Sequence, residues 1–208
     1  MTNTDDNNID LKAILVGESG VGKTNLINTS LGKEFDPNNN TTVAKSYSRK
    51  EFQINGKKYD IDLWDTAGQE SYRGITTMFI NNSQIVIFVY DITNEKSFDE
   101  LKKYWLNIIK EKLGNNFIGG VVGNKTDLND NQKVENEEGQ KFAESNGFKF
   151  ALVSAKSTPI LFTDFLEDLI KQYAENEKNV GNKKRAKSFK INTQSSIKKR
   201  KFCCWVWK

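Results

Sequence analysis

Short apolar runs alternate with amphipathic stretches from about Leu11 to Tyr173. The runs are rich in Val, Ile and Phe, which is typical of strands buried on both faces of a sheet. We expect such strands at Leu11–Val16, Ile61–Trp64, Gln84–Tyr90, Phe117–Val122 and Phe148–Val153. The stretches between them carry apolar residues at helical spacing, and we expect helices at Lys23–Leu31, Ser97–Leu113, Glu135–Asn146 and Ile160–Ala174. This alternation predicts an α/β fold with a mostly parallel sheet covered on both faces.

One pair of segments departs from the alternation. Val43–Phe52 and Lys57–Trp64 follow each other directly and are joined at Asn55-Gly56, a dipeptide that favours a tight antiparallel hairpin. The chain therefore predicts six strands and about five helices, with one antiparallel strand at the edge of the sheet.

Charge separates the chain into two parts. Asn176–Lys208 holds eleven Lys and Arg and one acid, a net charge of +10, which leaves −6 on the preceding residues. The composition from Asn176 to Arg200 is polar with few apolar residues, and we expect a disordered linker there. Met1–Asp10 is polar and acidic, without the basic and apolar regions of a signal peptide, and the apolar runs are too short to span a membrane. We therefore expect a cytoplasmic protein.

A glycine-rich loop stands between the first strand and the first helix. Gly17–Thr24 reads GESGVGKT and fits the pattern G-x-x-x-x-G-K-[ST] in the required strand–loop–helix context. Backbone N–H groups of such a loop approach phosphates closely, and the helix N-terminus adds positive potential. We expect Lys23 to reach the β- and γ-phosphates and the Thr24 hydroxyl to bind Mg²⁺. The alternative is a glycine-rich turn that only caps a helix, and the motif does not separate ATP from GTP.

Two further motifs follow later strands and indicate the base. Asn124-Lys125-Thr126-Asp127 comes after one strand and Ser154-Ala155-Lys156 after the next, at the sheet edge where α/β proteins bind ligands. The Asp127 carboxylate can accept hydrogen bonds from N1–H and the amino group of guanine, which adenine does not match. A backbone N–H of Ser154–Lys156 can bond the guanine O6. Alone, Asn124–Asp127 is more typical of a solvated Asx turn, but the ordered set predicts a guanine site.

These motifs resemble those of small GTPases of the Ras superfamily over roughly residues 10–175. The resemblance implies residues 1–9 as a disordered N-terminus, 10–175 as the GTP-binding domain and 176–208 as a basic tail with a double cysteine. It implies GTP, GDP and Mg²⁺ as ligands, with Phe35 on one face of the guanine and the Lys125 stem on the other; the alternative for Phe35 is a core residue. The nucleotide contacts implied are those of Gly17, Ser19, Gly20, Val21, Gly22, Lys23, Thr24, Phe35, Thr42, Asp65, Gly68, Asn124, Lys125, Asp127, Ser154, Ala155 and Lys156.

The resemblance also implies the hydrolytic residues. Asp65 holds Mg²⁺ through water, the Gly68 N–H bonds the γ-phosphate, and Gln69 orients the attacking water, with Lys23 and Thr42 completing the catalytic set. Thr42 binds Mg²⁺ and the γ-phosphate, with the neighbouring Thr41 as the competing assignment. No arginine in the phosphate loop or first switch is placed as an internal finger, so the intrinsic rate is expected on the order of 10⁻⁴ to 10⁻³ s⁻¹, accelerated by a partner's arginine.

Several segments are similar to the Rab branch, among them Trp64–Glu70, Tyr72–Thr76 and Val89–Thr93. Tyr47, Trp64 and Phe79 fall where Rabs place an aromatic trio for effectors, although half-buried aromatics of no special role fit equally well. The chain departs from the Rab pattern at Thr42-Val43-Ala44, usually Thr-Ile-Gly, and at Phe79–Ser83. We interpret it as a divergent Rab.

The tail predicts a membrane anchor. Cys203 and Cys204 are adjacent and offer no metal-ligand spacing. Two prenyl chains and a polybasic segment would give stable anchoring, although four residues follow the cysteines where Rab tails usually end within about three, and a C-a-a-X box is absent. Trp205 and Trp207 can themselves lie at a lipid interface. The alternative is a solvated tail with free thiols; no folded nucleic-acid recognition motif accompanies the charge.

The sequence thus predicts a Rab-like switch in vesicle traffic, an enzyme that hydrolyses GTP. Expected partners are an exchange factor, a GTPase-activating protein, effectors and, through the lipidated tail, the cytosolic face of an intracellular or plasma membrane; nucleic acid is not expected, and the protein is expected to be a monomer. Two alternatives remain at this point. One is a non-hydrolysing GTP-dependent scaffold, and the other is a Ras- or Rho-type signalling GTPase without a role in traffic.

Overall fold

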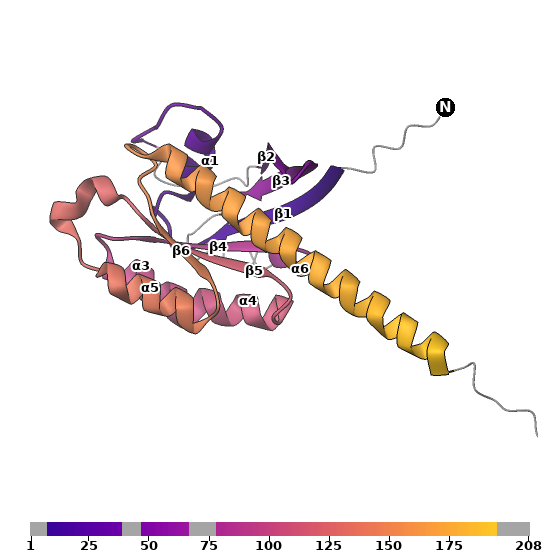
Figure 1. The fold of residues 1–208 in the computed structure, drawn as a ribbon. Coiled ribbons are helices and arrows are strands. Elements are labelled where there is room, and N and C mark those ends of the chain that lie inside the picture. Colours follow the sequence, from indigo (N-terminus) through magenta and orange to yellow (C-terminus); the bar gives the residue numbers. More distant parts are fainter. Residues whose placement is uncertain (1–7, 39–46, 67–77, 195–208) are drawn as a thin grey trace, which may run out of the picture. The chain divides into compact units, whose positions relative to one another are not determined.

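The computed structural model describes residues 8–38, 47–66 and 78–194 (Figure 1). Its strands are β1 (Asn8–Val16), β2 (Tyr47–Ile54), β3 (Lys57–Trp64), β4 (Ile85–Asp91), β5 (Ile118–Asn124) and β6 (Lys149–Leu152). Its helices are α1 (Lys23–Ser30), α3 (Glu95–Glu100), α4 (Leu106–Leu113), α5 (Asn136–Ser145) and α6 (Pro159–Gln194). A π-helical segment, Leu101–Trp105, joins α3 to α4, and a 3₁₀ helix spans Thr126–Asn131.

The six strands form one sheet in the order β2-β3-β1-β4-β5-β6. Every pair is parallel except β2–β3, which is antiparallel. Asn55 and Gly56 connect β2 to β3 with φ of 52° and 75°, the left-handed conformation that a two-residue hairpin turn requires. The predicted fold is confirmed, including the antiparallel strand at the edge.

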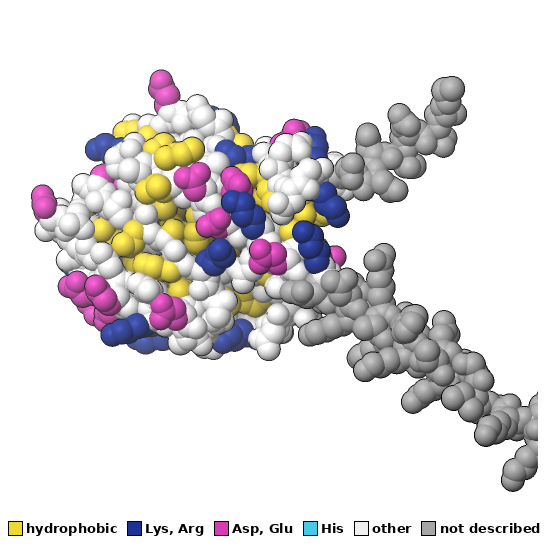
Figure 2. Space-filling view, in the orientation of Figure 1, with side chains coloured by type: hydrophobic (Ala, Val, Ile, Leu, Met, Phe, Trp, Pro, Cys, Tyr) yellow, Lys and Arg dark blue, Asp and Glu magenta, His cyan; other side chains and the backbone are white. Residues whose placement is uncertain are grey.

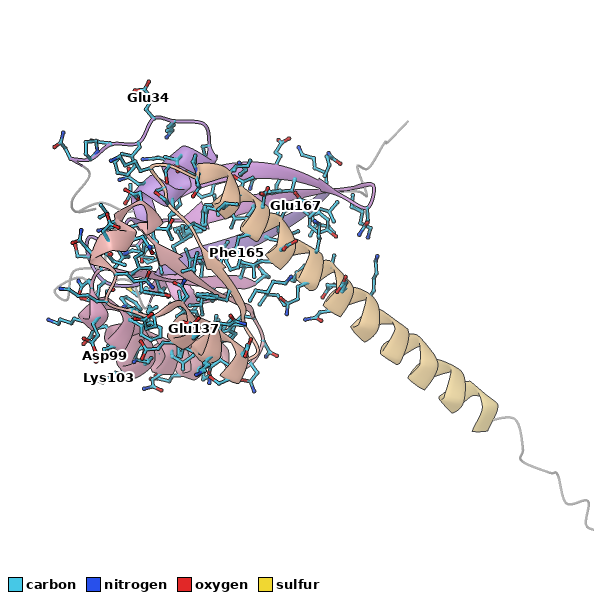
Figure 3. The ribbon with its side chains drawn as sticks, turned by 60° about the vertical axis from the view of Figure 1, so that its left-hand side comes forward. Glu34, Asp99, Lys103, Glu137, Phe165 and Glu167 are labelled. Atoms are coloured by element: carbon cyan, nitrogen blue, oxygen red, sulfur yellow. The ribbon has the colours of Figure 1, made fainter. Side chains whose placement is uncertain are left out.

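The helices cover both faces of the sheet, with α1 and the first half of α6 on one face and α3, α4 and α5 on the other (Figure 1). All seven residues of β4 are buried, because a central strand of a covered sheet contacts helices on both sides. Phe165 points from α6 toward the sheet (Figure 3). A Cβ at Gly120 of β5 would lie 2.8 Å from its ring, so the bare backbone of β5 lets the helix pack closely.

The end of the chain differs from the prediction. Helix α6 continues to Gln194, so the expectation of a disordered linker beginning at Asn176 is wrong for the part up to Gln194. The segment from Glu175 to Gln194 contains no proline and a single glycine, Gly181, and its five Lys, one Arg and two Glu residues favour a helix locally without a core to pack on. The chain divides into two compact units, Met1–Gln172 and Tyr173–Lys208.

At the N-terminal end, strand β1 begins earlier than predicted. Asn8 and Ile9 already belong to β1 and pair with Lys58 and Tyr59 of β3, where we expected a disordered segment through residue 9. Asn8 is held by its side chain, which donates a hydrogen bond of 3.0 Å to Asp60. Among the helices that the structure describes, none combines the length and the apolar character that crossing a bilayer would need.

Candidate functional site

The phosphate loop lies between the end of β1 and the start of α1. Gly17 has φ of 148°, and a Cβ there would lie 2.1 Å from the carbonyl oxygen of Val89. Gly22 has φ of 97°, and a Cβ there would lie 2.3 Å from Nδ2 of Asn124. A side chain fits at neither position, so the loop packs its own backbone against two strands. The loop ends at the N-terminus of α1, where the helix dipole favours an anion.

Lys23 is the basic residue of this motif and the first residue of α1. Its side chain is buried, and Nζ donates hydrogen bonds of 2.8 Å to the carbonyl oxygens of Gly17 and Glu18. Burial lowers the pKa of Lys23 to about 8, against the opposing effect of the negative charges of Asp65 and Glu18. Bound phosphates would place negative charge beside Lys23 and so raise its pKa, which keeps the side chain protonated. A bound anion would therefore stabilise the protonated form of Lys23 beside the loop.

Thr24 and Asp65 bring two hard oxygen ligands together. Thr24 follows Lys23 in α1, and its Oγ1 donates a hydrogen bond of 2.6 Å to Oδ2 of Asp65, which is buried beyond the end of β3. A hydroxyl and a carboxylate side by side, next to a phosphate loop, suit Mg²⁺, which takes a few protein oxygens together with phosphate and water. The third predicted metal ligand, Thr42, lies outside the described residues.

A cavity of about 270 Å³ opens beside the phosphate loop. Its walls come from the loop, from the segment after α1, and from the ends of β5 and β6. The residues that line it are Gly20, Gly22, Asn25, Phe35, Pro37, Asn124, Lys125, Asp127, Leu128, Ala155 and Lys156. The phosphate loop and the two guanine motifs, predicted from separate parts of the sequence, therefore meet in one cavity.

Asn124 links two walls of this cavity. It is buried at the end of β5, and its Nδ2 donates a hydrogen bond of 2.8 Å to the carbonyl oxygen of Val21 in the phosphate loop. Its Oδ1 accepts a hydrogen bond of 3.2 Å from the N–H of Ala155. A carboxamide serves here because it offers a donor and an acceptor on one short side chain. The phosphate loop and the segment after β6 are thereby held in register.

Ser154 orients the acid that faces the cavity. Its Oγ donates a hydrogen bond of 2.5 Å to Oδ1 of Asp127, and it accepts hydrogen bonds from the N–H groups of Lys156 and Ser157. The Ser154 hydroxyl therefore fixes both the carboxylate and the turn after β6. A carboxylate held this way, at the rim of a cavity, can accept hydrogen bonds from a planar donor pair on a base.

Some functional residues escaped the sequence analysis. Asp91, at the end of β4, pairs through Oδ2 with Nζ of Lys125 at 2.7 Å. Asn25 of α1 donates a hydrogen bond of 2.9 Å to the carbonyl oxygen of Asp36 and so fixes the segment that carries Phe35. Asp91 could have been predicted as a site residue, because it ends an apolar strand at the edge where the nucleotide motifs lie. For Asn25, the sequence offered only its position directly after the phosphate-loop motif.

The structure tests the placement of the predicted residues only in part. It describes Gly17, Ser19, Gly20, Val21, Gly22, Lys23, Thr24, Phe35, Asp65, Asn124, Lys125, Asp127, Ser154, Ala155 and Lys156. Phe35 lies in the segment after α1, and the others lie in the phosphate loop, at the start of α1 or around the strand ends beside it. Thr42, Gly68 and Gln69, and the two tail cysteines, Cys203 and Cys204, lie outside the described residues. The roles given to all of these side chains remain predictions.

The predicted aromatic trio does come together. The ring centroids of Tyr47 and Trp64 lie 5.8 Å apart, and those of Trp64 and Phe79 lie 5.5 Å apart. Tyr47 is about half exposed, and Nζ of Lys12 lies 4.8 Å from the centre of a Trp64 ring. The trio joins β2, β3 and the segment before β4 into one aromatic surface.

Comparison with known proteins agrees with this geometry. Residues 12–175 match the family model described as the Ras family. The chain is 40% identical over 147 residues to Ras-related protein Rab-8B of Homo sapiens, which covers 71% of this chain and 70% of that protein. It is 36% identical over 156 residues to Ras-related protein Rab-10 of Caenorhabditis elegans, with 75% and 77% covered. The chain therefore belongs to the Ras family as a Rab-type small GTPase, a switch that binds GTP and GDP with Mg²⁺, hydrolyses GTP and acts in vesicle traffic.

Proposed function

We propose that the cavity beside the phosphate loop binds guanine, with Asp127 as the residue that selects the base. The observation that carries this proposal is the hydrogen bond of 2.5 Å from Ser154 to Asp127, which leaves the second carboxylate oxygen and the cavity-facing edge for a ligand. Phe35 and Lys125 line the same cavity and sandwich the base. Adenine presents no matching donor pair and leaves the carboxylate desolvated and unpaired.

Displacement of a fluorescent GDP tests the base assignment. In the wild-type protein GTP displaces the probe and ATP does not. Asp127→Ala should weaken GTP binding by about 100-fold, because two charge-assisted hydrogen bonds are lost. Asp130→Ala is the matched control, since Asp130 is an exposed acid in the same 3₁₀ helix. If ATP competes as well as GTP in the wild-type protein, the base assignment is wrong.

For hydrolysis, we assign the metal to Thr24, Thr42 and Asp65 and the γ-phosphate to Lys23 and the Gly68 N–H. Mg²⁺, when bound, neutralises charge that develops on the phosphate oxygens. Lys23 binds and orients the β- and γ-phosphates from its place inside the loop, and Gln69 orients the attacking water. The contact between Thr24 and Asp65 supports the metal assignment. Positioning and charge neutralisation, rather than a strong base, carry the reaction.

A slow intrinsic rate follows from the residues around the phosphates. The chain has arginine at 49, 73, 185 and 200 and none in the phosphate loop or between Leu31 and Ala44. Without an arginine finger of its own, the protein hydrolyses GTP on the order of 10⁻⁴ to 10⁻³ s⁻¹. An activating protein would supply the missing arginine. Losing the γ-phosphate contact of Thr42 then releases the first switch, which ends the signal.

Partners of a Rab-type GTPase are an exchange factor, a GTPase-activating protein and effectors. We assign effector binding to the aromatic surface of Tyr47, Trp64 and Phe79, which come from β2, β3 and the segment before β4. We expect the protein to act as a monomer. On the face shown in Figure 2, acidic and basic side chains are interspersed, a distribution that supports the expectation that nucleic acid is not a partner.

The tail carries the proposed membrane attachment. We assign residues 1–9 to the N-terminal segment, 10–175 to the GTP-binding domain and 176–208 to the basic tail. Prenyl groups on Cys203 and Cys204, with the basic residues before them, would hold the protein on the cytosolic face of an intracellular or plasma membrane. Mass spectrometry of the C-terminal peptide from native cells tests this. Two prenyl adducts support the anchor, and free thiols exclude it while leaving the nucleotide chemistry intact.

The alternative functions make different predictions. A non-hydrolysing scaffold would bind GTP without converting it to GDP, although Asp65, Thr42 and Gln69 are all retained. A Ras- or Rho-type signalling protein would hydrolyse GTP but would not depend on Rab partners. The similarity to Rab-8 and Rab-10 proteins favours the Rab reading over both.

A further inference from the structure

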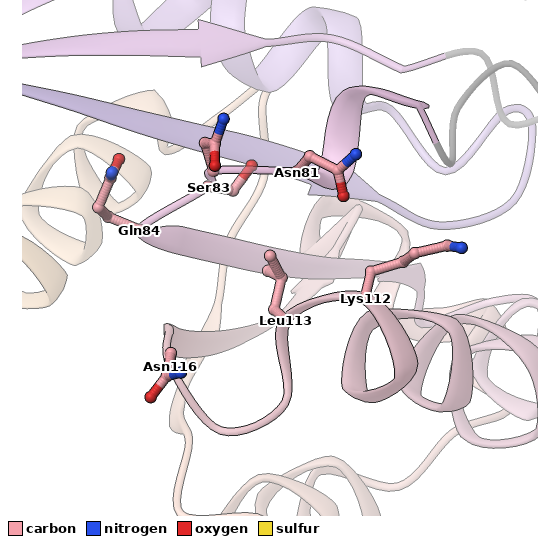
Figure 4. Close-up of a pocket in the computed structure, with 7 residues that line it drawn as sticks. Asn81, Ser83, Gln84, Lys112, Leu113 and Asn116 are labelled. Carbon is pink, nitrogen blue, oxygen red and sulfur yellow. The ribbon is translucent and has the colours of Figure 1, made fainter.

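A second cavity, of about 490 Å³, lies at the edge of the sheet opposite the nucleotide site. It is formed by two segments that each precede a strand: residues 81–84 before β4 and residues 112–116 before β5 (Figure 4). Because parallel strands all begin at the same edge, a ligand here would sit at the amino ends of β4 and β5 while the nucleotide sits at their carboxyl ends. We call it the amino-edge pocket; it is lined by Asn81, Asn82, Ser83, Gln84, Lys112, Leu113 and Asn116.

Ser83 is the observation that points to a ligand. The residue is about 97% buried, and its Oγ has no hydrogen-bond partner among the residues that the structure describes. A buried hydroxyl without a partner costs folding free energy, and such groups are few in native proteins. The backbone explains why Ser83 is held there: its N–H donates to the carbonyl oxygen of Ile80 at 3.2 Å, after Asn82 in the left-handed conformation with φ of 60°.

The neighbouring side chains make the pocket rich in donors. Oε1 of Gln84 accepts a hydrogen bond of 2.8 Å from the N–H of Lys12, so the free part of that carboxamide is its NH₂ group. Lys112 contributes an ammonium group. Nζ of Lys12 donates a hydrogen bond of 2.9 Å to the carbonyl oxygen of Asn81, which places a second positive charge beside the pocket. None of the residues that line it is an acid.

Two features oppose an anion, and both are weak. The C-terminus of α4 faces the pocket with the negative end of its dipole, but the N–H groups of Gly114 and Asn116 cap the carbonyl oxygens of Lys110 and Leu113, and the last turn carries Lys110 and Lys112. Glu111 pairs with Lys112 at 3.4 Å, but both side chains are exposed. An exposed ion pair is exchanged at little cost, so Lys112 can turn to a ligand.

We infer that the amino-edge pocket binds a small ligand through an oxyanion, a carboxylate or a phosphate group. Lys112 supplies the charge, the NH₂ group of Gln84 donates to one oxygen, and the Ser83 hydroxyl gains the partner that it lacks. The carboxamides of Asn81 and Asn116 surround the rest of the ligand. The site is separate from the nucleotide site and can be filled while GDP is bound.

The test is a titration of the ¹⁵N-labelled full-length protein, loaded with GDP and Mg²⁺ so that phosphate cannot occupy the nucleotide site. Inorganic phosphate and acetate are added separately at constant ionic strength, with glucose as a neutral control. The amide signals of Ser83, Gln84 and Asn116 should shift and saturate with at least one of the anions and not with glucose. Saturation with phosphate alone identifies a phosphate site, and saturation with acetate alone identifies a carboxylate site.

Three variants make the test specific. Lys112→Gln should weaken anion binding by about fivefold or more, because a charge-assisted hydrogen bond is lost. Ser83→Ala should weaken binding by about threefold while leaving the thermal stability without anion equal or higher, because an unpaired buried hydroxyl is removed. Lys103→Gln is the control, since Lys103 is an exposed lysine of the π-helical segment that leads into α4 and pairs with Asp99 of α3 (Figure 3). The inference is wrong if the shifts do not saturate, or if Lys112→Gln and Lys103→Gln behave alike.

Discussion

Asn124 tests how the nucleotide site is assembled. Replacing it by Leu keeps the branched shape, so the main change is the loss of two buried hydrogen bonds, to the Val21 carbonyl at 2.8 Å and from the Ala155 N–H at 3.2 Å. Each backbone group left unpaired costs about 1–3 kcal/mol, so the free energy of unfolding should fall by about 2–6 kcal/mol. For a domain of this size, that lowers Tm by at least about 4 °C.

The same change should loosen the nucleotide, because Asn124 joins the phosphate loop to the segment after β6. We expect GDP to dissociate about tenfold faster or more, which corresponds to about 1.4 kcal/mol lost from binding. Thermal unfolding at two GDP concentrations separates the intrinsic loss of stability from the loss of ligand stabilisation. Release of a fluorescent GDP measures the second effect directly.

Asn107→Leu is the matched control for this experiment. Asn107 also donates a hydrogen bond of 2.8 Å to a backbone carbonyl, that of Lys103, but on an exposed helix face. Its replacement should change the free energy of unfolding by less than about 0.5 kcal/mol. If Asn124→Leu and Asn107→Leu lower Tm equally, or if GDP release from Asn124→Leu is unchanged, Asn124 does not hold the site together.

Further predictions concern the metal, the buried lysine and the sheet. Thr24→Val should raise the Mg²⁺ concentration that slows GDP release by about tenfold or more, because one protein oxygen is lost. Thr29→Val, at the other end of the same helix, should leave that concentration unchanged. Without nucleotide, the free energy of unfolding of the wild-type protein relative to that of Lys23→Met should rise between pH 8 and about 10 by up to about 3 kcal/mol. The reason is that the folded protein releases the Lys23 proton near a pKa of about 8, while the unfolded chain keeps it up to a pKa of 10.5. Denaturant titrations that show no such rise would contradict a lowered pKa for the buried lysine. Gly119→Ala should destabilise the protein by about 1–3 kcal/mol, because the new Cβ would lie 2.1 Å from the Phe148 ring; an unchanged denaturation midpoint would show that the ring moves freely.

The fold class and the nucleotide motifs could be predicted from the sequence, because both depend on short stretches of neighbouring residues. The positions of the buried strands follow from short apolar runs, and the phosphate loop and the two guanine motifs each lie within a few residues. The order of the strands in the sheet came from the structure alone. The contacts that join the motifs are not local. The hydrogen bonds from Asn124 to Val21 and from Ser154 to Asp127 join residues 103 and 27 positions apart, and no residue pattern in a single sequence announces such a pair.

The same limit explains the missed residues and the end of α6. Asp91 pairs with Lys125 across two neighbouring strands, which becomes visible only when β4 and β5 lie side by side. The polar composition from Asn176 to Gln194 led to a prediction of disorder, because a segment with few apolar residues cannot form a core. The structure has a helix there instead. Helix formation there depends on backbone propensity, which the Lys and Arg residues raise and no proline interrupts.

This chain is a guanine-nucleotide switch that turns itself off by hydrolysis. The most direct test is single-turnover phosphate release from the GTP-loaded protein with Mg²⁺, comparing wild type with Gln69→Leu. We predict slow, Mg²⁺-dependent conversion to GDP in the wild type, on the order of 10⁻⁴ to 10⁻³ s⁻¹, and a much lower rate in the variant. No conversion in the wild type would leave a GTP-dependent scaffold, and equal rates in both proteins would remove Gln69 from the mechanism.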